Sequence, residues 1–307
     1  MYENRNPPDS VKLNLSVSAI FMLMYIIYRL LLLSLLWVAF LWPASGQRNP
    51  SQPFPYALGW KKDGPLAGGA LVMAALGYGL PRSKPVYTPQ DFSRLNPSSV
   101  NGLDRGATRY YSPADDRLRT YILAGTGVTG AALLPAIIYK TGDNLFWSHC
   151  IIVGTMYAEG LVLNLGAGEW CKKFVDRDRP YAYNMTLTYA QKSSQDYGSS
   201  FYSMTTALQW YTAGFIATVV NDLCPGSSWK YLVWGGAAAF SLAEGYLSVR
   251  SGQHFPTDVV VGALVGGFTG VLMPALHRKK GAKDRSFSVF PGLGFAGTPQ
   301  LCLVTHF

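Results

Sequence analysis

The chain has 307 residues, of which 49% are hydrophobic and only 14% are charged, and it carries a formal net charge of +9. This length suits one large domain or two small ones, and the low charge content is unusual for a soluble protein, which favours membrane association. The basic residues are not interleaved with aromatic residues on a recognisable nucleic-acid module. We therefore expect anionic lipid or a phosphorylated substrate as the partner, and no nucleic acid. The four cysteines are widely spaced, and no two of them have the spacing of a zinc site or of a redox motif.

The N-terminal residues 1–46 contain a basic residue, Arg29, followed by a long apolar stretch and then by small residues up to Gly46. This order is typical of a secretory signal peptide that is cleaved near Gly46. An uncleaved membrane anchor over residues 17–42 is the alternative. Both interpretations send the chain into a membrane or across it.

The remaining chain divides by composition into a polar part and an apolar part. Residues 47–118 form an N-terminal extension and polar connector, residues 119–280 a helical domain, and residues 281–307 a C-terminal tail. The domain is rich in Gly, Ala, Ser and Thr, which lets helices pack closely in membranes. We expect an all-α helical bundle of about five to six core helices, embedded in a membrane; the buried core of a soluble helical protein is the alternative. The helix-length blocks are 121–139, 146–168, 203–221, 231–249 and 259–276.

Basic flanks indicate the orientation of such a bundle. The segment "HRKKGAKDR" after Leu276 is the densest basic cluster, and basic flanks favour the cytoplasmic side. The start of the last helix, and His254 just before it, are then expected on the outer side of the membrane. The final "TPQLCLVTHF" alternates only loosely, so we expect a plain tail, with a strand near an outer membrane as the alternative.

Two stretches carry residues suited to phosphate chemistry. In "KKFVDRDRPYAY", Lys172 and Arg179 follow the end of an apolar helix. A lysine can hold a phosphate as a point charge and an arginine as a bidentate fork. Membrane-interface anchoring or pairing with the helix dipole is the alternative role.

The second stretch, "SVRSGQHFPTDVVVGALVGG", places Asp258 four residues after His254, at the start of a helix. From there the carboxylate can reach back to one imidazole nitrogen, which leaves the other nitrogen free as a nucleophile. In the alternative interpretation Asp258 only complements the helix dipole and His254 is an ordinary interfacial residue.

The order and helical setting of these stretches resemble those of the type 2 phosphatidic acid phosphatase and vanadium haloperoxidase superfamily. That family has Lys, six residues and Arg-Pro; then Pro-Ser-Gly-His opening a helix; then Ser-Arg, five residues, His, three residues and Asp. The resemblance implies that His254 is the nucleophile and Asp258 its orienting acid. It also implies that Lys172, Arg179 and Ser203 bind the phosphate, without any metal or other cofactor.

The chain departs from this pattern at several positions. In "SSFYSMTTA", Met204 stands where the family has glycine and Thr205 where it has the histidine that protonates the leaving oxygen. Ser248 stands in place of the second arginine, and Arg250, two residues later, points to nearly the opposite face of a helix. Loss of a general acid costs about 100- to 10,000-fold in rate.

The resemblance therefore implies a protein that hydrolyses or binds a phosphorylated lipid of the phosphatidate or isoprenoid diphosphate class. One interpretation of the departures is a phosphohistidine-type site with reduced or lost activity. A non-catalytic phospholipid-binding or structural envelope subunit is the other, because phosphate binding can persist where turnover does not.

Overall fold

The computed structural model describes residues 53–80, 86–140, 145–194 and 196–279, together with the backbone of two C-terminal strands. The signal peptide or anchor expected over residues 1–46 lies outside these residues. The elements in chain order are α2 (Trp60–Gly79), α3 (Pro89–Arg94), η1 (Pro97–Ser99), η2 (Arg105–Arg109), α4 (Pro113–Lys140), α5 (Phe146–Phe174), η3 (Pro180–Tyr183), α6 (Tyr189–Ser193), α7 (Met204–Leu223), α8 (Trp229–Arg250), α9 (Pro256–His277), β1 (Phe287–Leu293) and β2 (Pro299–Thr305).

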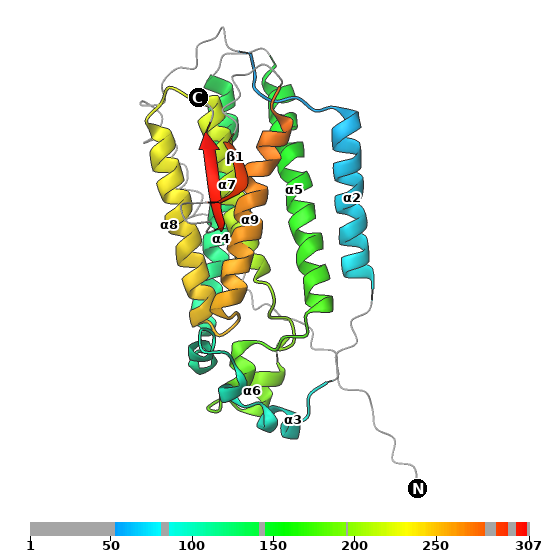
Figure 1. The fold of residues 1–307 in the computed structure, drawn as a ribbon, viewed down its shortest axis with the longest axis vertical. Coiled ribbons are helices and arrows are strands. Elements are labelled where there is room, and N and C mark those ends of the chain that lie inside the picture. The colour runs from blue at the N-terminus through cyan, green and yellow to red at the C-terminus, as the bar shows by residue number, and fades with distance from the viewer. Residues whose placement is uncertain are drawn as a thin grey trace, which may run out of the picture.

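The long helices form an elongated bundle (Figure 1). Helix α7 packs against α4, α5, α8 and α9, and most of its residues are buried as a result. Each apolar block predicted from the sequence coincides with one of these five helices, which confirms the all-α bundle. Helix α4 begins at Pro113, well before the predicted block, because Pro113 fits the first helical turn and Asp115 and Asp116 complement the positive end of the helix.

The outer surface of the bundle favours a membrane over a soluble core. Helices α4, α5 and α9 are each long and apolar enough to cross a membrane. Large apolar side chains are exposed on the outer faces, including Phe240 on α8 and Leu264 and Phe268 on α9. A water-soluble monomer rarely exposes so many large apolar residues along its helices.

Glycines at every fourth position bring α9 directly against α7. A Cβ atom at Gly262 would lie 2.5 Å from the carbonyl oxygen of Ser203, and one at Gly270 would lie 2.6 Å from that of Tyr211. Only glycine allows two helix backbones to approach this closely. The start of α9 therefore lies beside the start of α7, where the phosphate motifs are located.

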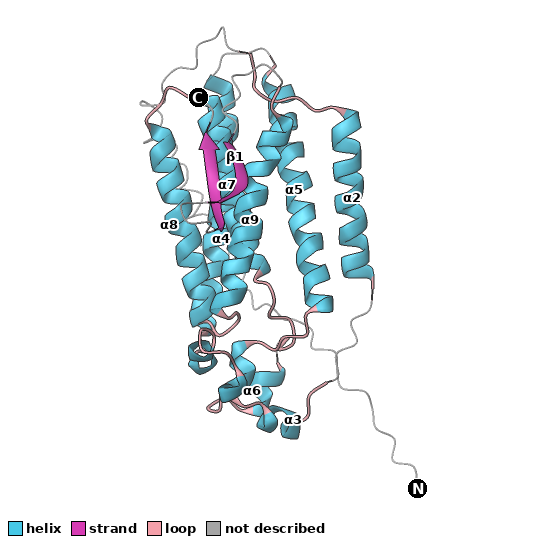
Figure 2. Ribbon diagram, viewed as in Figure 1, coloured by secondary structure: helices cyan, strands magenta, loops and turns pink. Residues whose placement is uncertain are grey.

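Helix α2 of the predicted N-terminal extension packs along α5, whereas the connector after it, together with the segment that carries α6, forms a cap at one end of the bundle. Figure 2 shows α3 and α6 beyond the ends of the long helices, joined by loops. Phe92 of α3 packs edge-on against Tyr189 and Tyr197, with ring centroids 5.9 and 5.0 Å away. The connector therefore covers the bundle end at which α4, α7 and α9 begin.

The C-terminal segment differs from the plain tail expected over residues 281–307. Strands β1 and β2 pair antiparallel, with Phe287 opposite Thr305 and Leu293 opposite Pro299. The sequence signal for this was the loose apolar alternation of the last residues, since alternation with a period of two fits a strand. Both strands follow the last helix, α9, in the sequence.

Candidate active site

The capped end of the bundle brings together the starts of α4, α7 and α9 and the end of α5. The backbone N–H of Ser203, the N-cap residue of α7, donates to the carbonyl oxygen of Asp258 in α9 at 3.1 Å. Lys172 and Arg179 lie close enough to His254 for their charges to act on its ring. The five residues predicted from the motifs thus gather in one region.

His254 is held in one tautomer by the backbone. Its ring is buried, and Nδ1 lies 2.8 Å from the carbonyl oxygen of Ser200. Because a carbonyl oxygen can only accept, Nδ1 carries the hydrogen and Nε2 keeps its lone pair. Burial, followed by the positive charges of Arg179 and Arg119, holds the pKa of His254 well below its ordinary value. A neutral imidazole with a free nitrogen is competent as a nucleophile.

Asp258 does not contact His254 directly, which corrects the expected pair. Its Oδ2 accepts from the backbone N–H of Phe255 at 2.9 Å and from the hydroxyl of Ser200 at 2.6 Å. The physical reason is that an acid at the third position of a helix reaches back to the N–H that precedes the helix. Asp258 therefore positions His254 through Ser200, whose carbonyl orients the ring.

A buried ion-pair network, which the motifs did not indicate, fixes Asp258 in turn. The guanidinium of Arg177 pairs with Asp258 and, through Nη2, with Oδ2 of Asp104 at 2.6 Å. Asp104 also accepts from the backbone N–H of Thr257 at 3.0 Å. Although burial opposes it, hydrogen bonds from Asn101 and Thr257 lower the pKa of Asp104, so the carboxylate stays ionised. The cap is thus tied to the first turn of α9.

Arg179 offers one donor that is already oriented and one that is free. Its Nη1 donates to Oε1 of Gln253 at 2.5 Å. Its Nε is buried and has no hydrogen-bond partner among the described residues. Since buried polar groups are normally paired, a phosphate oxygen is a suitable acceptor for this Nε–H.

Lys172 and Ser203 are less available than the motifs suggest. The ammonium of Lys172 forms an ion pair with Glu169 at 2.9 Å and lies 4.0 Å from the sulfur of Met204. The hydroxyl of Ser203 is fully buried, 2.8 Å from that of Thr206, where it caps α7. An anion would have to compete with Glu169 for the lysine.

Arg119, in the second turn of α4, is the main site residue that the motifs do not contain. It is 8% exposed, and its Nη1 donates to the hydroxyl of Thr205, which replaces the family histidine. The same guanidinium lies 3.8 Å from Glu244, whose carboxylate accepts from the Ser248 hydroxyl at 2.7 Å. Arg119 thus reaches the neighbourhood of Ser248, where the family has its second arginine.

Arg250 does not enter the site. Its side chain is 48% exposed, and its guanidinium lies 3.6 Å from Asp115 and 3.4 Å from the hydroxyl of Tyr246. The residue lies on the opposite face of α8 from Ser248, as the helical spacing predicts. Arg119 of α4, and not Arg250 of α8, is therefore the arginine that lies near Ser248, and it also forms an ion pair with Asp116 at 2.7 Å.

An apolar cavity of about 220 Å³ lies elsewhere, between α4, α5 and α7. Leu134, Tyr157 and Phe215 are among the residues that line it. The charged residues at the capped end take no part in this lining, so the cavity is separate from the phosphate chemistry.

Comparisons with known proteins identify the family of the chain. The family model of the PAP2 superfamily matches residues 126–282, about half of the chain. One similar solved structure is that of the first transmembrane PAP2-type phosphatidylglycerolphosphate phosphatase from Bacillus subtilis, with 21% identity and a TM-score of 0.37 over 70% of this chain and 94% of that chain. No curated protein matches. The chain belongs to the PAP2 superfamily.

Proposed function

We propose that this protein is a membrane-embedded phosphohydrolase that acts on a phosphorylated lipid, with His254 as its nucleophile and with a preference for lipid diphosphates over lipid monophosphates. The observation that carries the proposal is the setting of His254: a buried ring with Nδ1 bound to a backbone carbonyl, near the cations of Arg179, Arg119 and Lys172. Cations around a nucleophile suit an anionic substrate such as a phosphoryl group.

The reaction follows from this arrangement. Nε2 of His254 attacks the phosphorus, and the bond from phosphorus to the bridging oxygen breaks, so that the leaving group departs with the electron pair. Arg179 and Arg119 bind the nonbridging oxygens, where negative charge is held in the transition state. Water then attacks the phosphorus, the P–N bond breaks, and its electron pair returns to Nε2 while the water proton passes to solvent.

The preference for diphosphates rests on the absence of a general acid at position 205, where the family has a histidine. Thr205 has no proton of useful acidity near neutral pH, and its hydroxyl oxygen already accepts from Arg119. An alcohol would have to leave as a strongly basic alkoxide, whereas a phosphate leaves as a weakly basic anion with a second pKa of about 6. A site without a general acid therefore discriminates between the two leaving groups.

The test compares phosphate release from a lipid diphosphate and from phosphatidate, using the protein in detergent. We expect faster release from the diphosphate, complete dependence on His254 in a His254→Gln variant, and a smaller difference between substrates in Thr205→His. Equal rates on both substrates would contradict the preference, and release that persists in His254→Gln would remove the proposed nucleophile.

Non-catalytic binding of a phospholipid headgroup is the second candidate, favoured by the ion pair of Lys172 with Glu169 and by Met204 in the glycine position. It predicts that anionic-lipid binding survives His254→Gln and falls in Lys172→Ala/Arg179→Ala. Absence of phosphate release from either substrate, together with this binding pattern, would select the second candidate.

The proposed location is a bacterial cell envelope with the site on the periplasmic face. Arg278 and Lys279 follow α9 at the end opposite His254, and basic residues favour the cytoplasmic side. Protease accessibility of the cap from the outside of intact cells, or labelling of a cysteine introduced into the cap, tests this orientation.

A further inference from the structure

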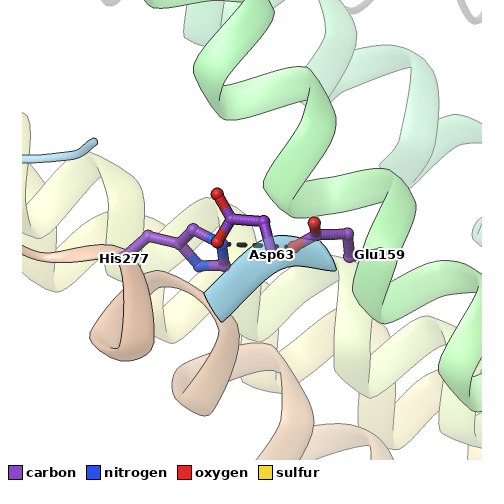
Figure 3. A group of neighbouring side chains, drawn as sticks. All are labelled: Asp63, Glu159 and His277. Atoms are coloured by element: carbon purple, nitrogen blue, oxygen red, sulfur yellow. Dashed lines mark ion pairs between the residues drawn. The ribbon is translucent and has the colours of Figure 1, made fainter. Parts of the chain in front are cut away.

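A second buried histidine lies at the other end of α9, and its surroundings are acidic. His277 contacts Asp63 of α2 and Glu159 of α5, and all three side chains point toward one another (Figure 3). Nε2 of His277 lies 3.1 Å from Oδ1 of Asp63 and 3.2 Å from Oε2 of Glu159. The cluster draws on three helices and lies outside the candidate active site.

The ring orientation of His277 directs a lone pair at the two carboxylates. Its Nδ1 lies 2.7 Å from the carbonyl oxygen of Met273, so Nδ1 donates and Nε2 is the acceptor in the neutral ring. A histidine whose other nitrogen is bound to a backbone carbonyl is the usual arrangement for a metal ligand. Three acceptor atoms facing one another need a proton or a cation between them.

A proton on Nε2 fits the cluster poorly. Nε2, Oδ1 of Asp63 and Oε2 of Glu159 are all buried, and none of them has a hydrogen-bond partner of acceptable geometry among the described residues. An N–H on Nε2 therefore points well at neither oxygen, although both are close. The ammonium of Lys62 lies 3.7 Å from the same oxygen of Asp63, which is also too long for a hydrogen bond.

The two separations from Nε2, 3.1 and 3.2 Å, suit a metal ion, and all three donor atoms lie within 4.8 Å of one another. Ligand bonds of about 2.0–2.2 Å at tetrahedral or octahedral angles place neighbouring donor atoms about 3.0–3.6 Å apart. One neutral imidazole and two carboxylates neutralise a divalent ion, so the buried cluster then carries no net charge. Mixed nitrogen and carboxylate ligands suit Zn²⁺ or Mn²⁺ better than Mg²⁺, which prefers oxygen ligands and water.

We propose that Asp63, Glu159 and His277 bind a divalent transition-metal ion, of the Zn²⁺ or Mn²⁺ class, that fastens α2 to α5 and α9. Helix α2 precedes the residues matched by the family model, so the ion ties an added helix to the family bundle. The role is structural, because the cluster lies at the opposite end of α9 from His254. It stands whether or not the protein hydrolyses phosphate.

The test uses the full chain in detergent after chelator treatment, titrated with ZnCl₂ by calorimetry and followed by thermal unfolding. We expect one Zn²⁺ per chain and a rise in the unfolding temperature. His277→Gln and Glu159→Gln each weaken binding at least about 100-fold and abolish the thermal shift, since each removes a ligand. The matched control is His254→Gln, which removes the buried histidine at the opposite end of α9 and keeps Zn²⁺ binding.

Two results would overturn the proposal without depending on the folding of a variant. The first is a wild-type chain that binds no Zn²⁺ or Mn²⁺ at micromolar concentration and shows no thermal shift, which would make the cluster an imidazolium shared by two carboxylates. The second is stoichiometric binding that His277→Gln leaves unchanged while the variant unfolds cooperatively.

Discussion

The two ends of α9 each hold a buried histidine, and the charges around them have opposite signs. His254 lies before the first turn among Arg179, Arg119 and Lys172. His277 lies in the last turn between two carboxylates. In both, Nδ1 donates to a backbone carbonyl, so the two rings present the same lone pair to their surroundings.

The comparison shows that the neighbours of a buried imidazole decide what it can bind. At the first end the surrounding cations favour an anion, and in the proposed reaction the lone pair of His254 attacks a phosphorus atom that carries anionic oxygens. At the second end the carboxylates exclude an anion, and the lone pair of His277 suits the proposed cation. If both proposals hold, one helix joins a site for phosphate chemistry to a site for a metal.

The largest change in activity should come from removing the side chain of Arg119, the cation near His254 that the motifs do not contain. We expect Arg119→Ala to lower kcat/KM for a lipid diphosphate by about 100-fold, because a group that stabilises transition-state charge is lost. The acid limb of the pH profile should also move to higher pH, since the charge of Arg119 lowers the pKa of His254. Both quantities come from one set of steady-state rates across pH.

Arg250→Ala is the matched control for this variant, because Arg250 is an exposed arginine outside the site. It should leave both the rate and the pH profile unchanged, and Arg119→Lys should recover part of the activity. An Arg119→Ala enzyme that behaves like Arg250→Ala would show that α4 supplies no part of the site.

A smaller effect, on stability, is expected from breaking the ion-pair network of Asp104, Arg177 and Asp258 that ties the cap to α9. Asp104→Asn should lower the free energy of unfolding by about 2 kcal/mol at pH 7, because Arg177 loses a buried partner. The native pKa of Asp104 is below its usual value, so its contribution is present above about pH 4 and is lost as the pH falls below that. Denaturant unfolding at pH 7 and at pH 3.5 measures both.

The difference between wild type and Asp104→Asn should therefore be large at pH 7 and shrink at pH 3.5. Asp176→Asn, an exposed carboxylate beside Arg177, is the control and should have little effect. A difference between wild type and Asp104→Asn that stays constant with pH would mean that the charge of Asp104 contributes nothing.

The smallest effect concerns the competition for Lys172. Glu169→Gln should tighten the binding of inorganic phosphate by about fivefold, because the lysine is released from an ion pair of about 1 kcal/mol. Competitive inhibition by phosphate gives the binding constant. The gain should disappear in Glu169→Gln/Lys172→Ala, and a gain that survives this second change would assign the effect to another residue.

The sequence predicted the bundle well because hydropathy blocks and small residues report directly on helix packing. It also brought Lys172, Arg179, Ser203, His254 and Asp258 into one region through their motifs. It could not indicate Arg119, because the first turns of α4 are polar and lie before the apolar block that marked the helix. A cation contributed from another helix leaves no trace in motif spacing.

The partners of Asp258 and Lys172 could not be predicted from motif spacing, because nearby groups compete for these two side chains. The spacing of His254 and Asp258 allowed a direct pair, but the N–H at the start of α9 is a nearer partner for the carboxylate. The spacing likewise left Lys172 open to phosphate, although Glu169 lies one helical turn before it and forms an ion pair with it.

The most direct test of the central claim is to look for phosphate on the nucleophile during turnover. The protein is mixed with excess lipid diphosphate, quenched in alkali and digested, and the peptides are analysed by mass spectrometry. We predict a phosphorylated peptide whose modification lies on His254 and whose amount rises during turnover. Release of phosphate with no modification at His254, or with the modification on another residue, would contradict the account.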